Sequence, residues 1–213
     1  MKNQSFRTHA PLLALSLSLL GLFTATSAMA QPAATMSTTP SASEALAPAQ
    51  LARALQQGGY VVYLRHAVTD TSRSDAKSQG DTDCDNQRVL SPAGRGMAST
   101  MAQPIKALKL RRQEVLSSPL CRTMDTATLA LGAATPTNAL REIEGRDYAQ
   151  LRRLMTTPVA RGSNRWLVGH GAPLRLTAGG PALAEGEAVV LRPAGSSWTV
   201  VARLQAADWA NVK

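Results

Sequence analysis

Two arginines and two histidines stand at the ends of predicted strands, where side chains leave the core. Arg65 and His66 directly follow the apolar run Tyr60–Leu64, Arg122 follows a second strand, and His170 ends a third. Ligands of open parallel α/β sheets bind beyond the carboxyl ends of the strands. We therefore expect all four side chains to converge at one edge of the sheet. The alternative, isolated surface charges and a hydrogen-bonded histidine, is disfavoured because the same chemistry recurs at three strand ends.

This set of side chains suits phosphoryl transfer. A guanidinium group presents a planar fork of donors that matches phosphate oxygens and neutralises their charge during transfer. A neutral imidazole is a competent nucleophile at phosphorus, and nearby guanidinium groups disfavour its protonated form. The second histidine can donate a hydrogen bond to the phosphoryl oxygens. No metal ion is required, and neither His66 nor His170 has metal-ligand spacing to a cysteine.

The elements that must position these residues alternate along the chain. Apolar runs bounded by turn residues predict strands, and Ser91-Pro92 is typical of a helix start. We predict strands over 60–64, 114–119, 165–170, 187–193 and 197–204, and helices over 49–57, 92–108 (bent at Pro104), 121–131 and 148–155. This order predicts an α/β fold, a three-layer α/β/α sandwich with a mainly parallel central sheet. The polar stretch 69–87 is interpreted as a long functional loop.

The first 48 residues do not look like part of this fold. A basic start, the apolar run Pro11–Phe23 and small residues ending in Ala28-Met29-Ala30 predict a secretory signal peptide over 1–30. An uncleaved membrane anchor is the alternative. The Ala/Ser/Thr/Pro-rich stretch 31–48 is interpreted as a flexible linker, which leaves one domain over 49–213. We expect no membrane span after signal cleavage and a periplasmic or secreted location.

Charge and cysteine content narrow the choice of partners. The formal net charge of +9 suits anionic ligands such as phosphate esters, although a generally basic surface would explain it as well. Nucleic acid is disfavoured because no basic run is interleaved with aromatic residues, which make up 4% of the chain. In an oxidising compartment Cys84 and Cys121 are expected to form a disulfide, with two free buried thiols as the alternative.

Three motifs in order, each behind a predicted strand, resemble those of the histidine phosphatase superfamily, the two-histidine phosphatases related to phosphoglycerate mutases. They are "LRHA" (Leu64–Ala67), "LSSPLCRTMDTA" (Leu116–Ala127) and "LVGH" (Leu167–His170), and "QRVLSPAGR" (Gln87–Arg95) matches the stretch that opens the family's first long helix. The resemblance spans most of residues 59–203. Together with the predicted signal peptide, these motifs resemble those of small secreted bacterial members of the superfamily. The resemblance implies a phosphoglycerate mutase-like fold.

The resemblance implies roles for five residues. His66 would be the nucleophile that becomes phosphohistidine, and Arg65 and Arg122 would bind the phosphoryl group. His170 would complete the pocket and stabilise the transition state. Thr69 stands where relatives often place a hydroxyl near the phosphate.

The general acid is left open by the sequence. A leaving alkoxide needs a proton, which mutase-like relatives take from a glutamate in an "LRE…G" setting. Here "LREIEG" offers Glu142 at the matching place, with Glu144 next, and Glu185 and Glu187 could also face the pocket. Relatives that act on phosphohistidine or phosphoanhydride bonds need no strong acid.

Two positions depart from the family pattern. Ala67 replaces the glycine of the commoner "RHG" motif, and a small side chain is expected to suffice. The acid-phosphatase branch has an aspartate directly after the second histidine; the residue here is Gly171, which disfavours that branch.

These observations predict a metal-independent phosphatase without a cofactor that hydrolyses phosphomonoesters through a phosphohistidine on His66. The substrate would be a small phosphorylated molecule or a phosphorylated envelope component. The alternative function is a non-catalytic module on the same fold that binds a phosphate ligand or a partner. A cation-rich adaptor on anionic membranes rests on charge alone and ranks last.

Overall fold

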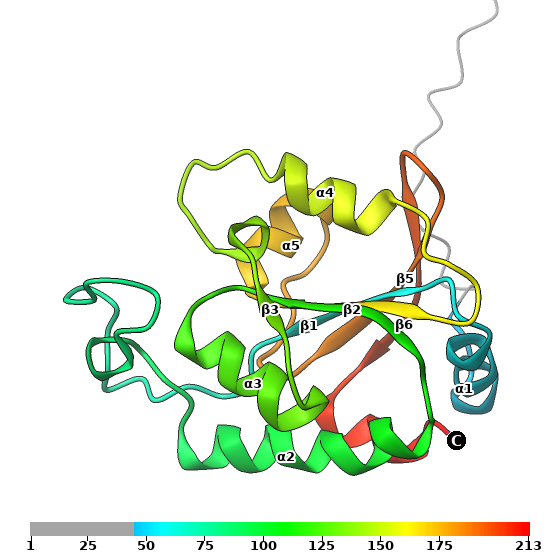
Figure 1. Cartoon of the computed structure of the whole chain (residues 1–213), viewed down its shortest axis with the longest axis horizontal. Helices are drawn as coiled ribbons and strands as arrows, with labels where there is room; N and C mark the ends of the chain where they lie inside the picture. Colours follow the sequence, from blue (N-terminus) through cyan, green and yellow to red (C-terminus); the bar gives the residue numbers. More distant parts are fainter. Residues whose placement is uncertain (1–44) are drawn as a thin grey trace, which may run out of the picture. The chain divides into compact units, whose positions relative to one another are not determined.

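The computed structural model describes residues 45–213 of the chain. The predicted signal peptide and most of the predicted linker lie outside the described residues. The elements, in chain order, are α1 (Pro48–Gln57), β1 (Val61–Arg65), η2 (Cys84–Asn86), α2 (Pro92–Ala107), β2 (Arg112–Ser117), α3 (Cys121–Leu131), β3 (Thr135–Pro136), η3 (Asn138–Leu140), α4 (Ala149–Thr156), β4 (Asn164–Gly169), α5 (Gly171–Ala178), β5 (Ala188–Pro193), β6 (Trp198–Leu204) and η4 (Ala206–Asn211) (Figure 1).

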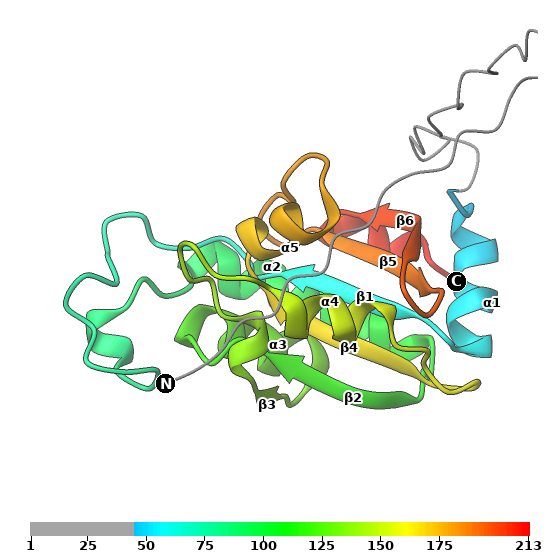
Figure 2. The same cartoon turned by 90° about the horizontal axis from the view of Figure 1, so that it is seen from above.

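The strands form one six-stranded sheet in the order β3-β2-β4-β1-β5-β6. The pairs β3–β2, β2–β4 and β4–β1 are parallel, whereas β1–β5 and β5–β6 are antiparallel. Figure 2 shows β2, β4 and β1 side by side within this sheet. The predicted mainly parallel sheet is confirmed, and the last two strands, β5 and β6, add an antiparallel hairpin to it.

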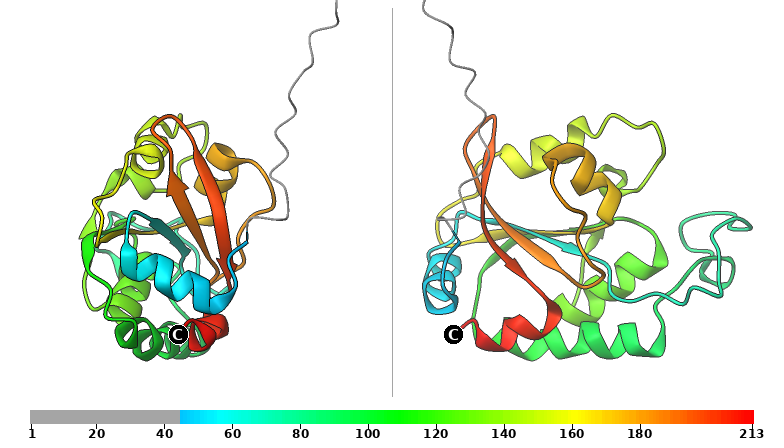
Figure 3. Two further views of the ribbon diagram at one scale, coloured as in Figure 1. Left: turned by 90° about the vertical axis from the view of Figure 1, so that its right-hand side faces the viewer. Right: turned by 180° about the vertical axis from the view of Figure 1, so that it is seen from behind.

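Helices cover both faces of the sheet, which gives the predicted three layers. In Figure 1, α2 and α3 lie on one face, and α4 and α5 lie on the other. Side chains of β1 alternate between the two faces, as the period of two in a strand requires. Val62 and Leu64 pack in the core beneath α2 and α3, whereas Val61 and Tyr63 pack in the core beneath α4. η4, at the carboxyl end of the chain, packs against α2 (Figure 3).

Two short backbone features bring α2 to the segment that follows β1. Ser91 caps the helix, because its hydroxyl accepts the Gly94 N–H at 3.0 Å, as the sequence predicts. Gly94 lies against the chain: a Cβ at this position would meet the Val68 carbonyl oxygen at 1.9 Å. The Ser91 N–H donates to the same carbonyl at 3.0 Å. Glycine at position 94 is therefore required by the close approach of α2 to the residues just after His66.

The sequence did not predict α5, β3 or the three 3₁₀ turns. α5 begins immediately after His170, but its sequence GAPLRLTA places a glycine and a proline in the first turn, and both are poor signals for a helix. β3 and the short 3₁₀ turns contain too few residues to show a hydrophobic period.

At the start of the domain, the Leu46 N–H already donates to the Val201 carbonyl of β6 at 2.8 Å. Among residues 45–213, no helix combines the length and the apolar character needed to cross a membrane.

Candidate active site

The three strand ends that carry the predicted site residues are neighbours in the sheet. β1, β4 and β2 run parallel, with Arg65 beside Gly169 and Ser117 beside Val168. The backbone continues this pairing past the strands, because the His66 N–H donates to the Gly169 carbonyl at 3.0 Å. The Ser118 N–H donates to the Val168 carbonyl at 2.9 Å. The structure therefore brings the three strand ends together at one edge of the sheet, as predicted.

His66 is a buried imidazole with one engaged nitrogen. Its side chain is 2% exposed, and Nδ1 lies 2.9 Å from the Ala67 carbonyl oxygen. A carbonyl can only accept, so Nδ1 carries the proton and Nε2 keeps its lone pair. Burial lowers the pKa of His66 to about 3, with smaller contributions from Arg122, Arg65 and Arg88. Nearby arginines were expected to keep the imidazole neutral, but burial is the larger cause.

His170 lies beside His66 and is held through its backbone. The two ring centroids are 5.4 Å apart, with an edge-on angle of 66°. The Tyr63 hydroxyl donates to the His170 carbonyl at 2.8 Å and accepts the His170 N–H at 3.1 Å. This hydroxyl needs room, because a Cβ on Gly169 would meet it at 2.4 Å. Burial raises the pKa of Tyr63, so the phenol stays protonated and keeps its donor.

The two ring nitrogens of His170 have different surroundings. Nε2 lies 2.8 Å from the Ser118 hydroxyl oxygen. Nδ1 is buried, has no hydrogen-bond partner among the described residues, and lies 3.8 Å from a carboxylate oxygen of Glu142. Burial lowers the pKa of His170 well below its ordinary value, and Arg122, His66, Arg65 and Arg88 lower it further. Both histidines are thus neutral at pH 7, with one nitrogen of each left for a ligand.

The two predicted phosphoryl-binding arginines have different partners. Arg65 Nη1 donates to the Leu183 carbonyl at 2.6 Å, and Nη2 lies 3.7 Å from Glu185. The Arg122 side chain, from the first turn of α3, is 5% exposed, and Nη1 contacts both carboxylate oxygens of Asp75. The Nε atoms of both arginines are buried and lack hydrogen-bond partners among the described residues. Both guanidinium groups therefore still have unused donors at the site.

The four candidate acids are placed differently. Glu142 lies beside His170, and its side chain is 45% exposed. Glu185 Oε1 lies 3.8 Å from His66 Nδ1 and accepts the Thr69 hydroxyl at 2.9 Å. Glu187 is buried and binds Arg203 Nε and the Ala184 N–H instead. Glu144 is exposed to solvent. The structure therefore brings Glu142 to His170 and Glu185 to His66.

Four residues near the site were missed by sequence reasoning: Tyr63, Asp75, Arg88 and Ser118. Arg88 is part of the quoted stretch "QRVLSPAGR", and its charge lowers the pKa of both histidines and of Arg122. Its Nε is buried without a hydrogen-bond partner among the described residues. Ser118 lies within another quoted motif, so its position was signalled although its role was not. Nothing in the sequence pattern distinguishes Asp75 from the other acids of the polar loop.

The predicted disulfide is present and ties the polar loop to the site. Cys84 and Cys121 are bonded, with Cα atoms 5.7 Å apart. Cys121 directly precedes Arg122, so the disulfide anchors the loop one residue from the buried guanidinium. Gln87, which is fully buried, adds to this anchor by accepting the Cys121 N–H at 2.9 Å.

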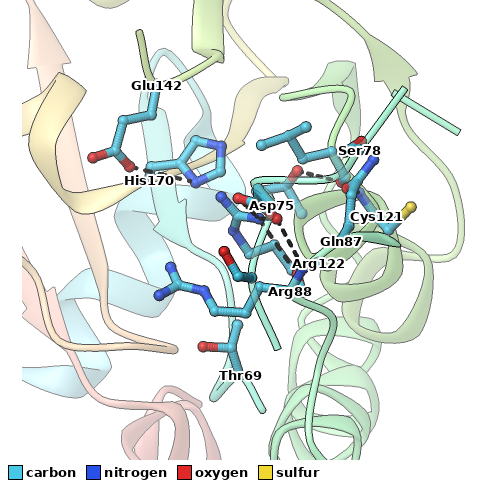
Figure 4. A network of polar contacts seen from close by, with 12 residues as sticks. Thr69, Asp75, Ser78, Gln87, Arg88, Cys121, Arg122, Glu142 and His170 are labelled. Atoms are coloured by element: carbon cyan, nitrogen blue, oxygen red, sulfur yellow. Dashed lines mark hydrogen bonds and ion pairs between the residues drawn. The ribbon is translucent and has the colours of Figure 1, made fainter. Parts of the chain in front are cut away.

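A cavity of about 530 Å³ opens beside the histidines, between the polar loop, the start of α3 at Leu120 and Arg122, and the segment with Arg141 and Glu142; neither histidine lines it. Its charged lining residues are Arg73, Asp75, Arg88, Arg122, Arg141 and Glu142. Four guanidinium groups thus face two carboxylates, and the excess of positive charge favours an anionic ligand. Figure 4 shows Asp75 against Arg122, and Glu142 against His170. Within residues 45–213, no group of three or more His, Cys, Asp or Glu side chains could hold a metal ion.

Comparison with known proteins agrees with this arrangement. The family model of the histidine phosphatase superfamily (branch 1) matches residues 61–168, about half of the 213-residue chain. No curated protein sequence matches the chain.

Three solved structures with the same fold are informative. The protein histidine phosphatase SixA complexed with tungstate is 16% identical, with a TM-score of 0.51, and the match covers 70% of this chain and 98% of that one. A protein from Nakamurella multipartitia that bears the SixA designation is 18% identical, with a TM-score of 0.50 and coverage of 69% and 95%. Mycobacterial hydrolase 1 is 17% identical, with a TM-score of 0.51 and coverage of 67% and 96%. At these identities the likeness establishes the fold.

Proposed function

The chain belongs to the histidine phosphatase superfamily, branch 1, and we propose that it is a metal-independent phosphatase that hydrolyses phosphomonoesters through a phosphohistidine on His66. The observation that carries this proposal is the pair of buried, neutral histidines at adjacent strand ends, with ring centroids 5.4 Å apart. Arg65 and Arg122 stand beside them with unused donors. A nucleophile, a hydrogen-bond donor and two cationic clamps are thus within one small region.

In the first step, the lone pair on His66 Nε2 attacks phosphorus while the bond from phosphorus to the ester oxygen breaks. Nδ1 stays bound to the Ala67 carbonyl, which orients the ring. The arginines neutralise the charge that spreads over the phosphoryl oxygens during transfer. In the second step, water attacks phosphorus and the bond to nitrogen breaks. This step releases inorganic phosphate and regenerates the neutral imidazole.

Glu142 is the best-placed general acid. It lines the cavity with Arg122 and lies 3.8 Å from His170 Nδ1, so it is next to the phosphoryl pocket and still reached by solvent. It would protonate the leaving alkoxide and then accept a proton from the attacking water. Glu185 faces His66 Nδ1, the nitrogen that does not attack, and is held there by Thr69. We therefore assign Glu185 and Thr69 to orienting His66 and stabilising the positive charge of phosphohistidine.

The placement of Glu142 also bears on the substrate class. Phosphohistidine and phosphoanhydride bonds have good leaving groups, and an enzyme for them does not need a strong acid. An alkoxide is a poor leaving group, so a carboxyl group beside the pocket supports a phosphomonoester. We propose a small phosphorylated molecule or a phosphorylated envelope component as substrate. A periplasmic or secreted location follows only if residues 1–30 act as a signal peptide.

The test is hydrolysis of an aryl phosphate in the presence of EDTA, by the parent protein and by His66→Ala. We expect turnover in the parent and its loss in the variant. Rapid acid-free quenching with labelled substrate should trap one phosphoryl group on the parent and none on His66→Ala. If phosphate protects both proteins from thermal unfolding but neither turns over, the non-catalytic binding module takes the place of the enzyme.

A further inference from the structure

Asp75 occupies Nη1 of Arg122, one of the two arginines proposed to bind the phosphoryl group. Its two carboxylate oxygens lie 3.1 and 2.9 Å from Arg122 Nη1. One of them also accepts the Arg88 backbone N–H at 2.7 Å. Figure 4 shows the Asp75 carboxylate between these two partners. A guanidinium group and a backbone N–H are the groups that proteins use to bind phosphate oxygens.

The origin of Asp75 makes this contact unusual. The Arg122 side chain is 5% exposed and belongs to α3, whereas the Asp75 side chain is 41% exposed and belongs to the polar loop. A carboxylate on an exposed loop normally remains in water, and an ion pair that it forms there adds little stability. Here it reaches from the surface to a buried cation beside two neutral histidines. The Asp75 carboxylate thus compensates a buried charge from a partly exposed position.

We propose that Asp75 is an internal competitor for the phosphoryl site: its carboxylate takes the oxygen positions on Arg122 and on the Arg88 N–H that the substrate's phosphoryl group takes during catalysis, and so it sets the affinity for phosphate esters. This inference rests on the proposed role of Arg122 in binding the phosphoryl group. It adds a residue that controls affinity without acting on the reacting atoms.

A phosphoryl group has the means to displace Asp75. A phosphate monoester carries up to two negative charges, and it would contact Arg65 and the guanidinium of Arg88 in addition to Arg122. The Nε atoms of Arg65 and Arg88 are buried without hydrogen-bond partners among the described residues, so these donors gain from an incoming anion. Asp75 gains from release, because its carboxylate returns to water.

The disulfide keeps Asp75 close to Arg122. Asp75 is nine positions before Cys84, which is bonded to the residue next to Arg122. A tethered group binds with a high effective concentration. If the contact is closed about 90% of the time, the apparent dissociation constant of an external anion is about tenfold weaker than that of the open site.

The experiment compares Asp75→Asn and Asp75→Ala with the parent. The dissociation constant of inorganic phosphate is measured by calorimetry, and KM and kcat are measured with an aryl phosphate. Asp85→Asn is the matched control: it removes the same charge from the same loop, and the exposed Asp85 side chain makes no hydrogen bond or ion pair in the part of the chain that is described. We expect both Asp75 variants to bind phosphate about tenfold more tightly and to lower KM, with kcat within about twofold of the parent. Asp85→Asn should stay within about twofold of the parent.

The outcomes separate this inference from the proposed function. Unchanged or weaker phosphate binding in both Asp75 variants would overturn it, and so would a collapse of kcat at unchanged KM, which would make Asp75 a catalytic group. Phosphate that binds neither the parent nor the variants would overturn it as well. If the Asp75 variants bind phosphate more tightly but neither they nor the parent turn over substrate, Asp75 is a competitor for phosphate and the proposed enzymatic function is wrong.

Discussion

The strand-end cluster (Arg65, His66, Ser118, Arg122 and His170) and the polar loop (residues 70–87) meet at the ion pair between Arg122 and Asp75, but they are held in opposite ways. In the cluster, all members but Arg65 are buried. A backbone bond to Gly169 positions His66, and the Tyr63 hydroxyl holds the backbone of His170. In the loop, Gln87 is the one buried residue. The loop is held by ion pairs from its partly exposed Asp75 and Asp81, by turns, and by the bond between Cys84 and Cys121.

This difference separates the chemistry from the control of access. Buried backbone bonds and packed strands place the reacting groups to within a fraction of an ångström, which phosphoryl transfer requires. Exposed polar contacts are individually worth about 1 kcal/mol or less, so they can open and close. We therefore expect changes in the cluster to alter kcat, and changes in the loop to alter KM or stability.

The largest effect is expected from Arg122, where the two regions meet. Arg122→Ala removes the buried cation that neutralises the transferring phosphoryl group, and kcat/KM for an aryl phosphate should fall about 1,000-fold. The fall should be the same in the double variant Arg122→Ala/Asp75→Asn, because without the arginine Asp75 has nothing to compete for. Steady-state kinetics of the parent and the two variants measure both effects.

Arg95→Ala is the control for Arg122. Arg95 also pairs with an aspartate, Asp125, but the pair is exposed and joins α2 to α3 outside the cluster. Its activity should stay within about twofold of the parent. A loss of less than tenfold in Arg122→Ala would place the phosphoryl group elsewhere in the cavity.

The second prediction concerns the disulfide, and it should change stability rather than chemistry. The bond closes a loop with a sequence separation of 37. On the chain-entropy model, its removal by Cys84→Ser/Cys121→Ser lowers the free energy of unfolding by about 4 kcal/mol. Because the strand-end bonds do not depend on it, kcat should change by less than about threefold. Urea unfolding and kinetics on the folded variant measure the two quantities, and a kcat that falls with stability would show that the cluster depends on the loop.

The third prediction uses acid to probe the buried cluster. The pKa of His66 is about 3 in the folded protein and near its ordinary value of 6.5 in the unfolded chain. Between these values the unfolded chain binds more protons, so stability is full above pH 6.5 and is lost as the pH falls. The loss attributable to His66 is at most about 1.4 kcal/mol per pH unit.

The comparison that isolates this term is the parent against His66→Gln, which keeps a hydrogen-bonding side chain that does not titrate. Urea unfolding between pH 4 and pH 7 should give a shallower decline in the variant. Equal slopes would mean that His66 is hydrated in the folded protein, and the description of the cluster as buried would then be wrong.

The same division explains how far the sequence predicts the molecule. Apolar strands followed by charged residues placed His66, Arg122 and His170 correctly, since strand pairing and burial leave one arrangement for them. The bounds of α3 were predicted exactly as Cys121–Leu131, because a glycine at 132 ends the helix. The disulfide was predicted from the count of cysteines and the compartment.

The features that the sequence did not predict depend on contacts made by irregular segments, which have no hydrophobic periodicity. Asp75 and Asp81 look alike in the sequence, yet one meets the buried Arg122 and the other meets the half-exposed Arg141. Which partner each finds depends on the path of an irregular loop. Glu185 and Glu187 are likewise two positions apart, and only the former contacts His66. Short-range pattern carries no information on such pairings.

The smallest effect is expected from Ser118, a positioning residue within the cluster. Its hydroxyl lies 2.8 Å from His170 Nε2, and its own backbone carbonyl accepts the hydroxyls of Ser117 and Thr123. If the Ser118 hydroxyl donates to Nε2, the proton of His170 stays on Nδ1, where it can reach a phosphoryl oxygen. Ser118→Ala should then lower kcat about tenfold and leave KM within about twofold.

A loss of packing alone would not change the tautomer, so the decisive readout is the pair of ¹⁵N chemical shifts of the His170 ring. In the parent, Nδ1 should be the protonated nitrogen, and in Ser118→Ala the two tautomers should mix. Ser118→Thr keeps the hydroxyl and should restore both the shifts and kcat. If the parent already carries the proton on Nε2, Ser118 accepts rather than donates, and His170 would offer phosphate a lone pair that repels it.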